Sequence, residues 1–272
     1  NKKFWNFFIK KVKKSKKKKI KNVKYISCDI RKLKDLKKKI NKNYEYVINL
    51  SGNIDHKKNN ETFEVHYNGL NNLLKTINLK KLELFLQIGS CLEYGRKPSP
   101  QKENFFCKPI SYYGKAKYMA SNLLQKKITN FIILRPYQVY GPYQKYDRLI
   151  PMVIKSCLKN KNFPCTQGNQ ERDFLYVDDF TDLIIKILKK KKFANRIFNV
   201  GYGKPVKVKK IINLILKITS KGNPLFGNIK MRKDEVKKLY PDLSLIKKEL
   251  KWKPKISLKE GLKRTVAYYA KN

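Results

Sequence analysis

Short apolar runs alternate with segments of helical periodicity over the first half of the chain. The runs predict strands at residues 23–27, 46–50, 84–89 and 131–135. Between them, apolar residues spaced three and four apart predict helices at residues 33–40, 60–77 and 115–127. Strands that are apolar almost throughout are typical of a parallel sheet covered by helices on both faces. The pattern therefore predicts an α/β fold with a doubly wound parallel sheet.

The pattern changes after Pro142. Helical segments at residues 149–158, 179–188, 208–219 and 258–269 are separated by short strands and by Gly/Pro turns. This predicts a smaller C-terminal α/β lobe over residues 143–272, with residues 174–203 returning to the first sheet. Residues 1–22 combine aromatic side chains with a lysine run, which fits either an apolar edge with a solvated loop or a membrane-surface helix.

Composition narrows the class of protein. The longest apolar runs are much shorter than the roughly 18 residues that a membrane span needs. The five cysteines form no C-x-x-C pair, which indicates reduced thiols rather than a disulfide framework or a zinc site. We therefore expect a cytoplasmic protein without a membrane span and without a bound metal.

The formal net charge of +45 raises the question of nucleic-acid binding. Of the 65 basic residues, 57 are lysines spread over the whole chain and eight are arginines. Proteins that read base sequence depend on arginine forks, which this chain has in small number. We therefore expect no dedicated nucleic-acid partner. The charge still favours an anionic substrate, which the surface attracts electrostatically.

Three residues have the chemistry of a proton-transfer site. Tyr113 and Lys117 lie four apart at the start of a predicted helix, so they share one face. An ammonium beside a phenol stabilises the phenolate, which can then exchange a proton with a substrate hydroxyl. Ser90 follows a predicted strand 23 residues earlier, where its hydroxyl can share that proton.

Motifs in a fixed order support this interpretation. From about Val23 to its end, the sequence resembles the extended short-chain dehydrogenase/reductases, specifically the NAD-dependent epimerase/dehydratase family that acts on nucleotide sugars. Besides the three residues above, the motifs that carry the resemblance include Gly69-Leu-Asn-Asn-Leu-Leu74, Leu134-Arg-Pro-Tyr137, Val139-Tyr-Gly-Pro142, Gly168-Asn-Gln-Glu-Arg-Asp-Phe174 and Leu250-Lys-Trp-Lys-Pro254.

The resemblance implies a role for each matching position. Ser90, Tyr113 and Lys117 correspond to the catalytic trio. The positions that correspond to cofactor-binding residues are Asp29, Ile30, Leu50, Ser51, Gly52, Tyr113, Lys117 and Tyr137. The positions that correspond to substrate-binding residues are Ser90, Gln138, Arg172 and Arg232, the two arginines facing a diphosphate. Four positions depart from the family pattern: Ser51, His66, Gln138 and Lys251, of which His66 and Gln138 stand where the family has asparagine.

The resemblance also implies a function. Residues 1–142 correspond to a Rossmann-like cofactor-binding domain and residues 143–272 mainly to a substrate-binding lobe. The cofactor is NAD or NADP, the substrate is a nucleotide-diphosphate sugar, and a homodimer is usual. The expected reaction is hydride transfer at a sugar carbon, C4 in most members, as in an epimerase. Two alternatives stay open: a nucleotide 4-keto-6-deoxy-sugar reductase, and a non-catalytic cofactor-sensing or RNA-associated relative.

Two features modify this expectation. Dehydratases of the family carry an acid/base pair directly after the serine, where this sequence has Cys91 and Leu92, so dehydration is disfavoured. The family also opens with a strand and a glycine-rich turn that holds the cofactor pyrophosphate at a helix N-terminus. No such turn precedes Val23. We therefore expect either that the chain is the remainder of a longer protein or that it cannot hold a dinucleotide well, and that this polypeptide alone binds NAD poorly.

Overall fold

The computed structural model describes Lys21 and residues 23–40, 43–53, 59–190, 195–231 and 235–271. The expectations for Arg232 and for nearly all of residues 1–22 lie outside this part of the chain. The described residues form two compact units. Unit 1 draws on the ranges Asn1–Gly95, Phe106–Arg135 and Lys192–Phe198, and unit 2 on Arg96–Phe105, Pro136–Lys191 and Asn199–Asn272.

Unit 1 contains the long strands that the apolar runs predict. Its strands are β1 (Tyr46–Asn49), β2 (Leu84–Ile88), β3 (Phe131–Pro136) and β8 (Arg196–Val200), the last residues of β3 and β8 belonging to unit 2. Its helical segments are α1 (Leu33–Lys39), α2 (Asn59–Phe63), the π-helical η1 (Glu64–Asn68), α3 (Gly69–Thr76), the 3-10 turns η2 (Leu79–Lys81) and η3 (Cys91–Tyr94), and α4 (Tyr112–Lys127).

The four strands form one sheet in the order β1-β2-β3-β8. β2 pairs in parallel with β1 and with β3, and the register places Asn49 opposite Gln87. The predicted α/β class with a parallel sheet is confirmed. The predicted strand at residues 23–27 is wrong, because these residues have no strand conformation in the structure. Their alternating side chains suit a strand, but no strand among the described residues pairs with them.

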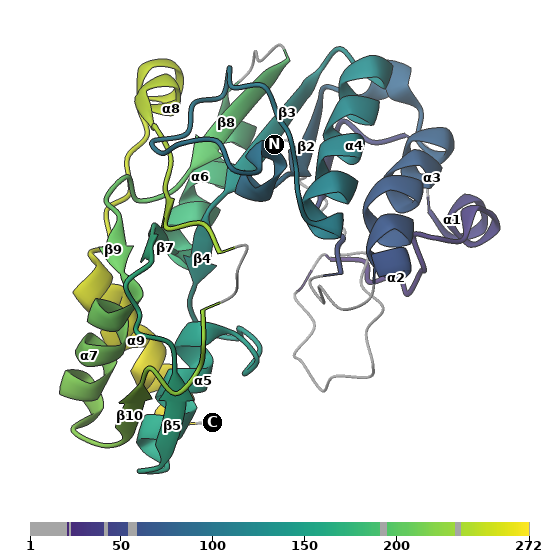
Figure 1. The fold of residues 1–272 in the computed structure, drawn as a ribbon. Coiled ribbons are helices and arrows are strands. Elements are labelled where there is room, and N and C mark those ends of the chain that lie inside the picture. The colour runs from purple at the N-terminus through teal and green to yellow at the C-terminus, as the bar shows by residue number, and fades with distance from the viewer. Residues whose placement is uncertain are drawn as a thin grey trace. The chain divides into compact units, whose positions relative to one another are not determined.

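The core of unit 1 lies between the sheet and its helices. Apolar side chains of α3 and α4 pack on β2 and β3, as the following buried residues show: Leu70, Leu73, Leu74, Phe85, Ala120, Leu124, Phe131 and Ile133. Figure 1 shows α3 and α4 side by side next to these strands. The spacing of Leu70, Leu73 and Leu74 puts them on one face of α3, so the apolar face predicted from the sequence is the one that is buried.

Unit 2 is built from helices and short strand pairs. Its helices are α5 (Leu149–Leu158), α6 (Val177–Lys189), α7 (Val208–Thr219), α8 (Ser244–Leu250) and α9 (Leu258–Ala270). Its strands are β4 (Gln138–Tyr140), β5 (Asn162–Cys165), β6 (Glu171–Arg172), β7 (Phe174–Tyr176), β9 (Val206–Lys207), β10 (Asn223–Phe226) and β11 (Lys238–Leu239). α5, α7 and α9 enclose a second apolar core that includes Ile154, Ile211 and Leu262.

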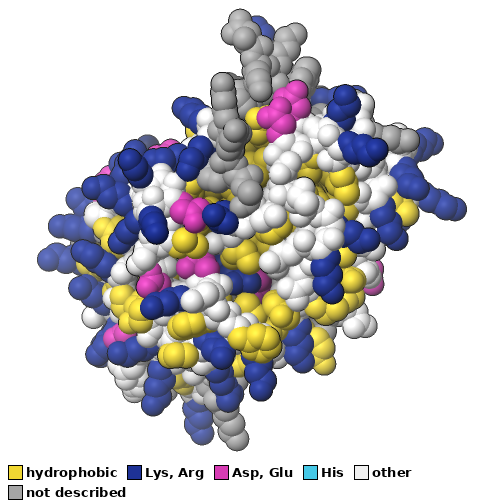
Figure 2. Space-filling view, turned by 90° about the horizontal axis from the view of Figure 1, so that it is seen from above, with side chains coloured by type: hydrophobic (Ala, Val, Ile, Leu, Met, Phe, Trp, Pro, Cys, Tyr) yellow, Lys and Arg dark blue, Asp and Glu magenta, His cyan; other side chains and the backbone are white. Residues whose placement is uncertain are grey.

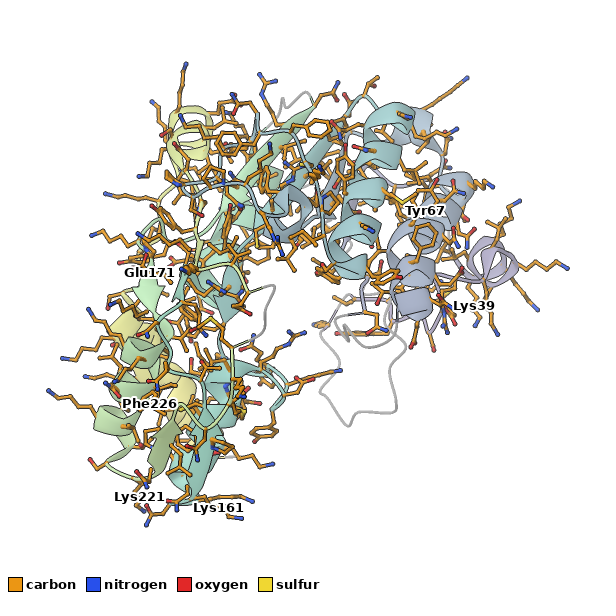
Figure 3. The ribbon with its side chains drawn as sticks, in the orientation of Figure 1. Lys39, Tyr67, Lys161, Glu171, Lys221 and Phe226 are labelled. Carbon is orange, nitrogen blue, oxygen red and sulfur yellow. The ribbon has the colours of Figure 1, made fainter. Side chains whose placement is uncertain are left out.

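Basic side chains cover much of the surface. Figure 2 shows lysine and arginine side chains in many separate places on the visible face, with apolar and uncharged areas between them. In unit 2, Lys161 and Lys221 lie beside each other at the end of the β10–β5 pair (Figure 3). Among the described residues, no helix has the length and hydrophobicity to cross a membrane, and no cluster of His, Cys, Asp and Glu could hold a metal ion.

The buried face of α3 provides a test of the fold. Leu70 is fully buried in the core of unit 1, whereas Leu79 in η2 is exposed. Leu70→Ala is expected to lower the free energy of unfolding by about 2–5 kcal/mol, because it leaves a cavity. The matched control Leu79→Ala should change it by less than about 1 kcal/mol. Urea denaturation followed by circular dichroism measures both, and equal effects would contradict the packing described here.

Candidate active site

Ser90 lies at the carboxyl end of β2, in the turn that begins η3. Its hydroxyl oxygen accepts a hydrogen bond from the Leu92 amide at 3.2 Å. Its own amide donates to Glu93 Oε1 at 2.8 Å, which completes a capping box. Both bonds hold the turn in one conformation. The carboxyl ends of parallel strands are where open α/β sheets bind their ligands, so Ser90 is placed at such an edge.

Tyr113 and Lys117 reach the same place from α4. The helix begins at Tyr112 because the Ser111 hydroxyl caps it, accepting from the Gly114 amide at 3.1 Å. Gly114 lies against the turn of Ser90: a Cβ at this position would be 2.5 Å from the Leu92 carbonyl oxygen. Only glycine allows α4 to approach η3 this closely.

Lys117 is buried to 4% exposure, and its ammonium donates to the Ile88 carbonyl at 2.7 Å. The ammonium also lies 5.8 Å from the centre of the Tyr113 ring, which is half-buried. Burial lowers the pKa of Lys117 to about 8, and the charge of Glu93 opposes this shift. The structure thus brings Ser90, Tyr113 and Lys117 to one end of β2.

A buried ion pair lies beneath this group. Glu93 is fully buried, and its Oε2 accepts from Arg135 Nε and Nη2, both at 2.9 Å. Arg135 comes from β3 and its guanidinium lies 4.6 Å from the centre of the Tyr94 ring. A Cβ on Gly89 would be 2.6 Å from Glu93 Oε1, so the carboxylate fits only because residue 89 is glycine.

His66 takes the place of the expected asparagine in η1. Its Nε2 lies 3.0 Å from the Asn53 carbonyl oxygen, and because a carbonyl only accepts, Nε2 carries the proton. The ring meets Tyr113 edge-on at 5.2 Å between centres. Nδ1 is buried and has no hydrogen-bond partner among the described residues. Burial, together with the charge of Lys117, lowers the pKa of His66 to about 3, so the ring is neutral at physiological pH.

The segment after β1 holds the predicted cofactor residues Leu50, Ser51 and Gly52. Leu50 is 51% exposed, and a Cβ on Gly52 would be 2.7 Å from the His66 ring. Ser51 is held by Asn49, whose Oδ1 accepts from its amide at 3.1 Å and from its hydroxyl at 2.5 Å. Asn49 in turn donates to Gln87 Oε1 at 2.8 Å, across β1 and β2. The glycine at position 52 therefore lets the segment pack closely on the His66 ring, and the Leu50 side chain stays exposed.

The predicted cofactor residues Asp29 and Ile30 lie in a loop that α3 holds in place. Asn72 donates to the Ile30 and Arg31 carbonyls at 3.2 and 2.9 Å. A Cβ on Gly69 would be 2.8 Å from the Ile30 side chain. The Asp29 carboxylate accepts from Arg31 Nε at 2.9 Å and Nη2 at 2.7 Å. The glycine and asparagine of the Gly69–Leu74 motif therefore act on this loop.

The remaining predicted residues belong to unit 2. Tyr137 is buried and donates to Gln101 Oε1 at 2.8 Å, whereas the side chain of Gln138 is exposed on β4. Arg172 on β6 is buried, with one guanidinium nitrogen bonded to the Glu171 carbonyl at 2.7 Å and another to the Glu235 carboxylate. Lysine would not make this forked contact.

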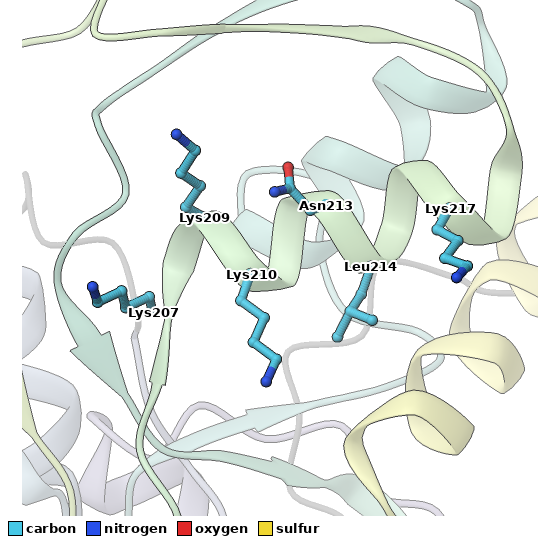
Figure 4. Close-up of a pocket in the computed structure, with 6 residues that line it drawn as sticks. All are labelled: Lys207, Lys209, Lys210, Asn213, Leu214 and Lys217. Carbon is cyan, nitrogen blue, oxygen red and sulfur yellow. The ribbon is translucent and has the colours of Figure 1, made fainter.

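An open pocket of about 380 Å³ lies elsewhere in unit 2, along α7. Figure 4 shows Lys207, Lys209, Lys210 and Lys217 around it. Its lining contains none of the predicted site residues, and its four ammonium groups have the solvated character of the rest of the surface. The pocket therefore adds positive potential, without the converging polar groups of a built site.

Sequence reasoning missed several residues that support the site. In the sequence, Arg135 appears only within the Leu134-Arg-Pro-Tyr137 motif, and no motif points to Glu93. Asn49 and Gln87 were not singled out, although polar side chains at the ends of two apolar strands are a usable signal. The partner of Arg172 is Glu235, 63 residues away in sequence, for which no local pattern exists.

Comparison with known proteins shows the family of this chain. The model of the NAD-dependent epimerase/dehydratase family matches residues 5–201. The chain is 32% identical to a putative UDP-glucose 4-epimerase of Methanocaldococcus jannaschii, over 91% of this chain and 84% of that protein. The chain belongs to the NAD-dependent epimerase/dehydratase family. The resemblance inferred from the sequence is thereby confirmed.

Two further proteins extend the comparison. A UDP-glucuronate 4-epimerase of Thermodesulfobacterium geofontis is 32% identical over 74% of this chain, which spans 62% of that relative's length. The crystal structure of a UDP-glucose 4-epimerase from Thermotoga maritima, solved with UDP-glucose, superposes with a TM-score of 0.84 at 26% identity, covering 93% of this chain and 86% of that one. The predicted enzyme class and NAD dependence are confirmed at the level of the family.

The neutral state of His66 predicts how stability depends on pH. The unfolded imidazole takes up a proton near pH 6.5 and the buried one near pH 3, so the unfolded state binds more protons between these values. Stability contributed by this group is present above pH 6.5 and lost as the pH falls, by about 1.4 kcal/mol per pH unit.

The comparison of wild type with His66→Asn isolates this effect. In denaturation experiments at pH 4.5, 6 and 7.5, the wild type should lose stability relative to the variant as the pH falls. A difference that stays constant over this range would show that His66 is not held neutral by burial.

Proposed function

We propose that this chain is an NAD(P)-dependent nucleotide-sugar 4-epimerase, with Ser90, Tyr113 and Lys117 as its catalytic residues. The observation that carries the proposal is the arrival of all three residues at the carboxyl end of β2. Ser90 is held there by η3, and Lys117 by the Ile88 carbonyl. Unit 1, with Asp29, Ile30, Leu50, Ser51 and Gly52, is assigned to the cofactor.

In this mechanism Tyr113 removes the proton from the sugar hydroxyl. The positive charge of Lys117, 5.8 Å from the ring centre, favours the phenolate that accepts this proton. His66 lies against the same ring as a neutral group, so it adds no competing charge. NAD, held by the residues of unit 1 assigned to it above, would accept the hydride of the sugar carbon and would supply it again for reduction on the other face, which would give the epimer.

Ser90 is suited to hydrogen-bond the sugar oxygen. Its hydroxyl oxygen already accepts from the Leu92 amide, which leaves its own proton to be donated to an acceptor. A donor aimed at the developing carbonyl oxygen stabilises the charge that accumulates there. The capping box prevents the serine from turning away, which lowers the cost of orientation.

The same turn argues against a 4,6-dehydratase. That reaction needs an acid/base pair directly after the serine, where this chain has Cys91 and Leu92. Leucine has no proton to exchange, and the Cys91 thiol is buried. Glu93 points inward to Arg135, so it does not face a substrate. These contacts support epimerisation over dehydration.

Arg172 is assigned to the substrate diphosphate. Its guanidinium is fixed by Glu235 and by the Glu171 carbonyl, so its remaining donors have a defined direction. A planar fork suits two phosphate oxygens. We also assign Gln138, and Arg232 outside the described residues, to the substrate.

Tyr113→Phe tests the catalytic assignment. The variant loses the hydroxyl that carries the proton, so interconversion of UDP-glucose and UDP-galactose with added NAD should fall by at least about 100-fold. Tyr112→Phe is the matched control, because the neighbouring ring is exposed and should leave the rate unchanged. Chromatography of the nucleotide sugars measures both. An unchanged rate in Tyr113→Phe would refute the assignment, and net oxidation of NADPH would indicate a reductase.

Arg172→Lys tests the diphosphate assignment. Lysine keeps the charge and loses the fork, so the KM for UDP-glucose should rise about tenfold with little change in kcat. Arg264→Lys is the control, since Arg264 lies on the exposed face of α9 and pairs with Glu260. Equal effects of the two substitutions would contradict a specific role for Arg172.

A further inference from the structure

Glu93 and Arg135 are buried charges that the proposed reaction does not use. Both residues are less than one-twentieth exposed. The pair connects the ends of two strands, because Glu93 follows β2 and Arg135 lies at the end of β3. Each carboxylate oxygen has its own partner. Oε1 accepts from the Ser90 amide and Oε2 accepts from the Arg135 guanidinium.

We propose that the Glu93–Arg135 ion pair positions this active site. Through it, β3 fixes the orientation of Ser90 and places a negative charge near the ammonium of Lys117. The proposal rests on the proposed function for Ser90 and Lys117. Neither Glu93 nor Arg135 touches a substrate in it, so both are positioning residues.

A short series of contacts connects Arg135 of β3 to Ser90. The Arg135 side chain is held by two nitrogen contacts to Glu93 Oε2 and by the Tyr94 ring beneath it. The Gly89 amide donates to the Leu134 carbonyl at 2.7 Å, so the backbone of β2 is tied to β3 at the same level. Ser90 is therefore fixed to β3 both through its neighbour's backbone and through its own amide.

The pair also acts on Lys117 through charge. The ionisable groups that face this ammonium are Glu93 from η3, Tyr113 from its own helix and His66 from η1. While Tyr113 is protonated and His66 is neutral, the Glu93 carboxylate favours the protonated amine of Lys117, against the effect of burial. Lys117 in turn donates to Ile88, two residues before Ser90. The Glu93 carboxylate therefore acts on both ends of the segment from Ile88 to Ser90: directly on the Ser90 amide, and through the charge of Lys117 on Ile88.

Stability alone does not explain a pair of this kind. Desolvation of two charges offsets much of their attraction, and well-packed apolar residues of similar size often replace a buried pair without loss of stability. Apolar residues cannot accept a hydrogen bond from the Ser90 amide. A positioning role and a structural role therefore make different predictions for such a replacement.

The decisive variant is Glu93→Leu combined with Arg135→Met, which removes both charges together. We expect the melting temperature to stay within a few degrees of wild type. Hydrogen exchange of the Ser90 amide, measured by mass spectrometry on the protein without substrate, should become about 10- to 100-fold faster, because a charge-assisted hydrogen bond is lost. The matched control is Glu260→Leu with Arg264→Met, which removes an exposed pair of the same composition.

Kinetics then separate positioning from folding. With UDP-glucose and NAD, kcat of the double variant should fall about 10- to 100-fold while KM changes less than threefold, because the substrate still binds and the serine is misplaced. The pH at which activity declines on the alkaline side should also move down, since Lys117 has lost its carboxylate. Wild-type exchange at Ser90 together with wild-type kcat would overturn the proposal.

A second variant and a readout that does not depend on activity complete the test. If the double variant does not fold, Glu93→Gln carries the test, because it keeps an oxygen near the Ser90 amide and removes the charge. It should speed exchange by about 3- to 10-fold, and unchanged exchange would refute the proposal. If wild type shows no epimerase activity even at saturating NAD, the proposed function fails, but amide exchange still decides whether the pair holds Ser90.

Discussion

The arrangement of unit 1 depends on keeping the ammonium of Lys117 charged although it is almost entirely buried. A buried cation is costly unless hydrogen bonds and an opposite charge compensate it. The Ile88 carbonyl provides the hydrogen bond and Glu93 provides the charge. His66, the other titratable ring at this place, is held neutral and so does not compete.

The hydrogen bond and the opposite charge that compensate Lys117 both come from the carboxyl end of β2 and the turn after it. The segment from Ile88 to Ser90 bonds to Lys117 of α4, to Leu134 of β3 and to Glu93 of η3. Glycine at position 89 makes room for the carboxylate, and glycine at position 114 lets α4 approach the turn. The site is therefore built on a strand end that neighbouring elements hold from several sides, which suits a group that must be oriented precisely.

Much of the fold could be predicted from the sequence. The apolar runs predicted β1, β2 and β3 to within about two residues, because strands buried in a parallel sheet are apolar along their whole length. Residues 23–27 have the same local pattern and form no strand, since a strand also needs a pairing partner, which local sequence does not reveal. The apolar spacing predicts α4 from residue 115, three residues after its observed start at Tyr112, because that spacing carries no information about the Ser111 cap.

The site could be predicted only in part. The spacing of Tyr113 and Lys117 is a local signal, and the family motifs supplied Ser90. The pairings of Glu93 with Arg135 and of Arg172 with Glu235 join residues 42 and 63 positions apart, so charge type alone could not identify them. His66 was recognised as a departure from the family pattern, but only the structure shows that it packs on Tyr113 and on the loop after β1.

The central claim is that one site at the end of β2 removes a hydride from a sugar carbon and returns it. The most direct measurement uses UDP-galactose deuterated at C4, incubated with the protein and NAD in ordinary water. Mass spectrometry of the UDP-glucose formed should find the deuterium still at C4, since the same hydride is returned. A product whose C4 hydrogen comes from solvent would contradict the account.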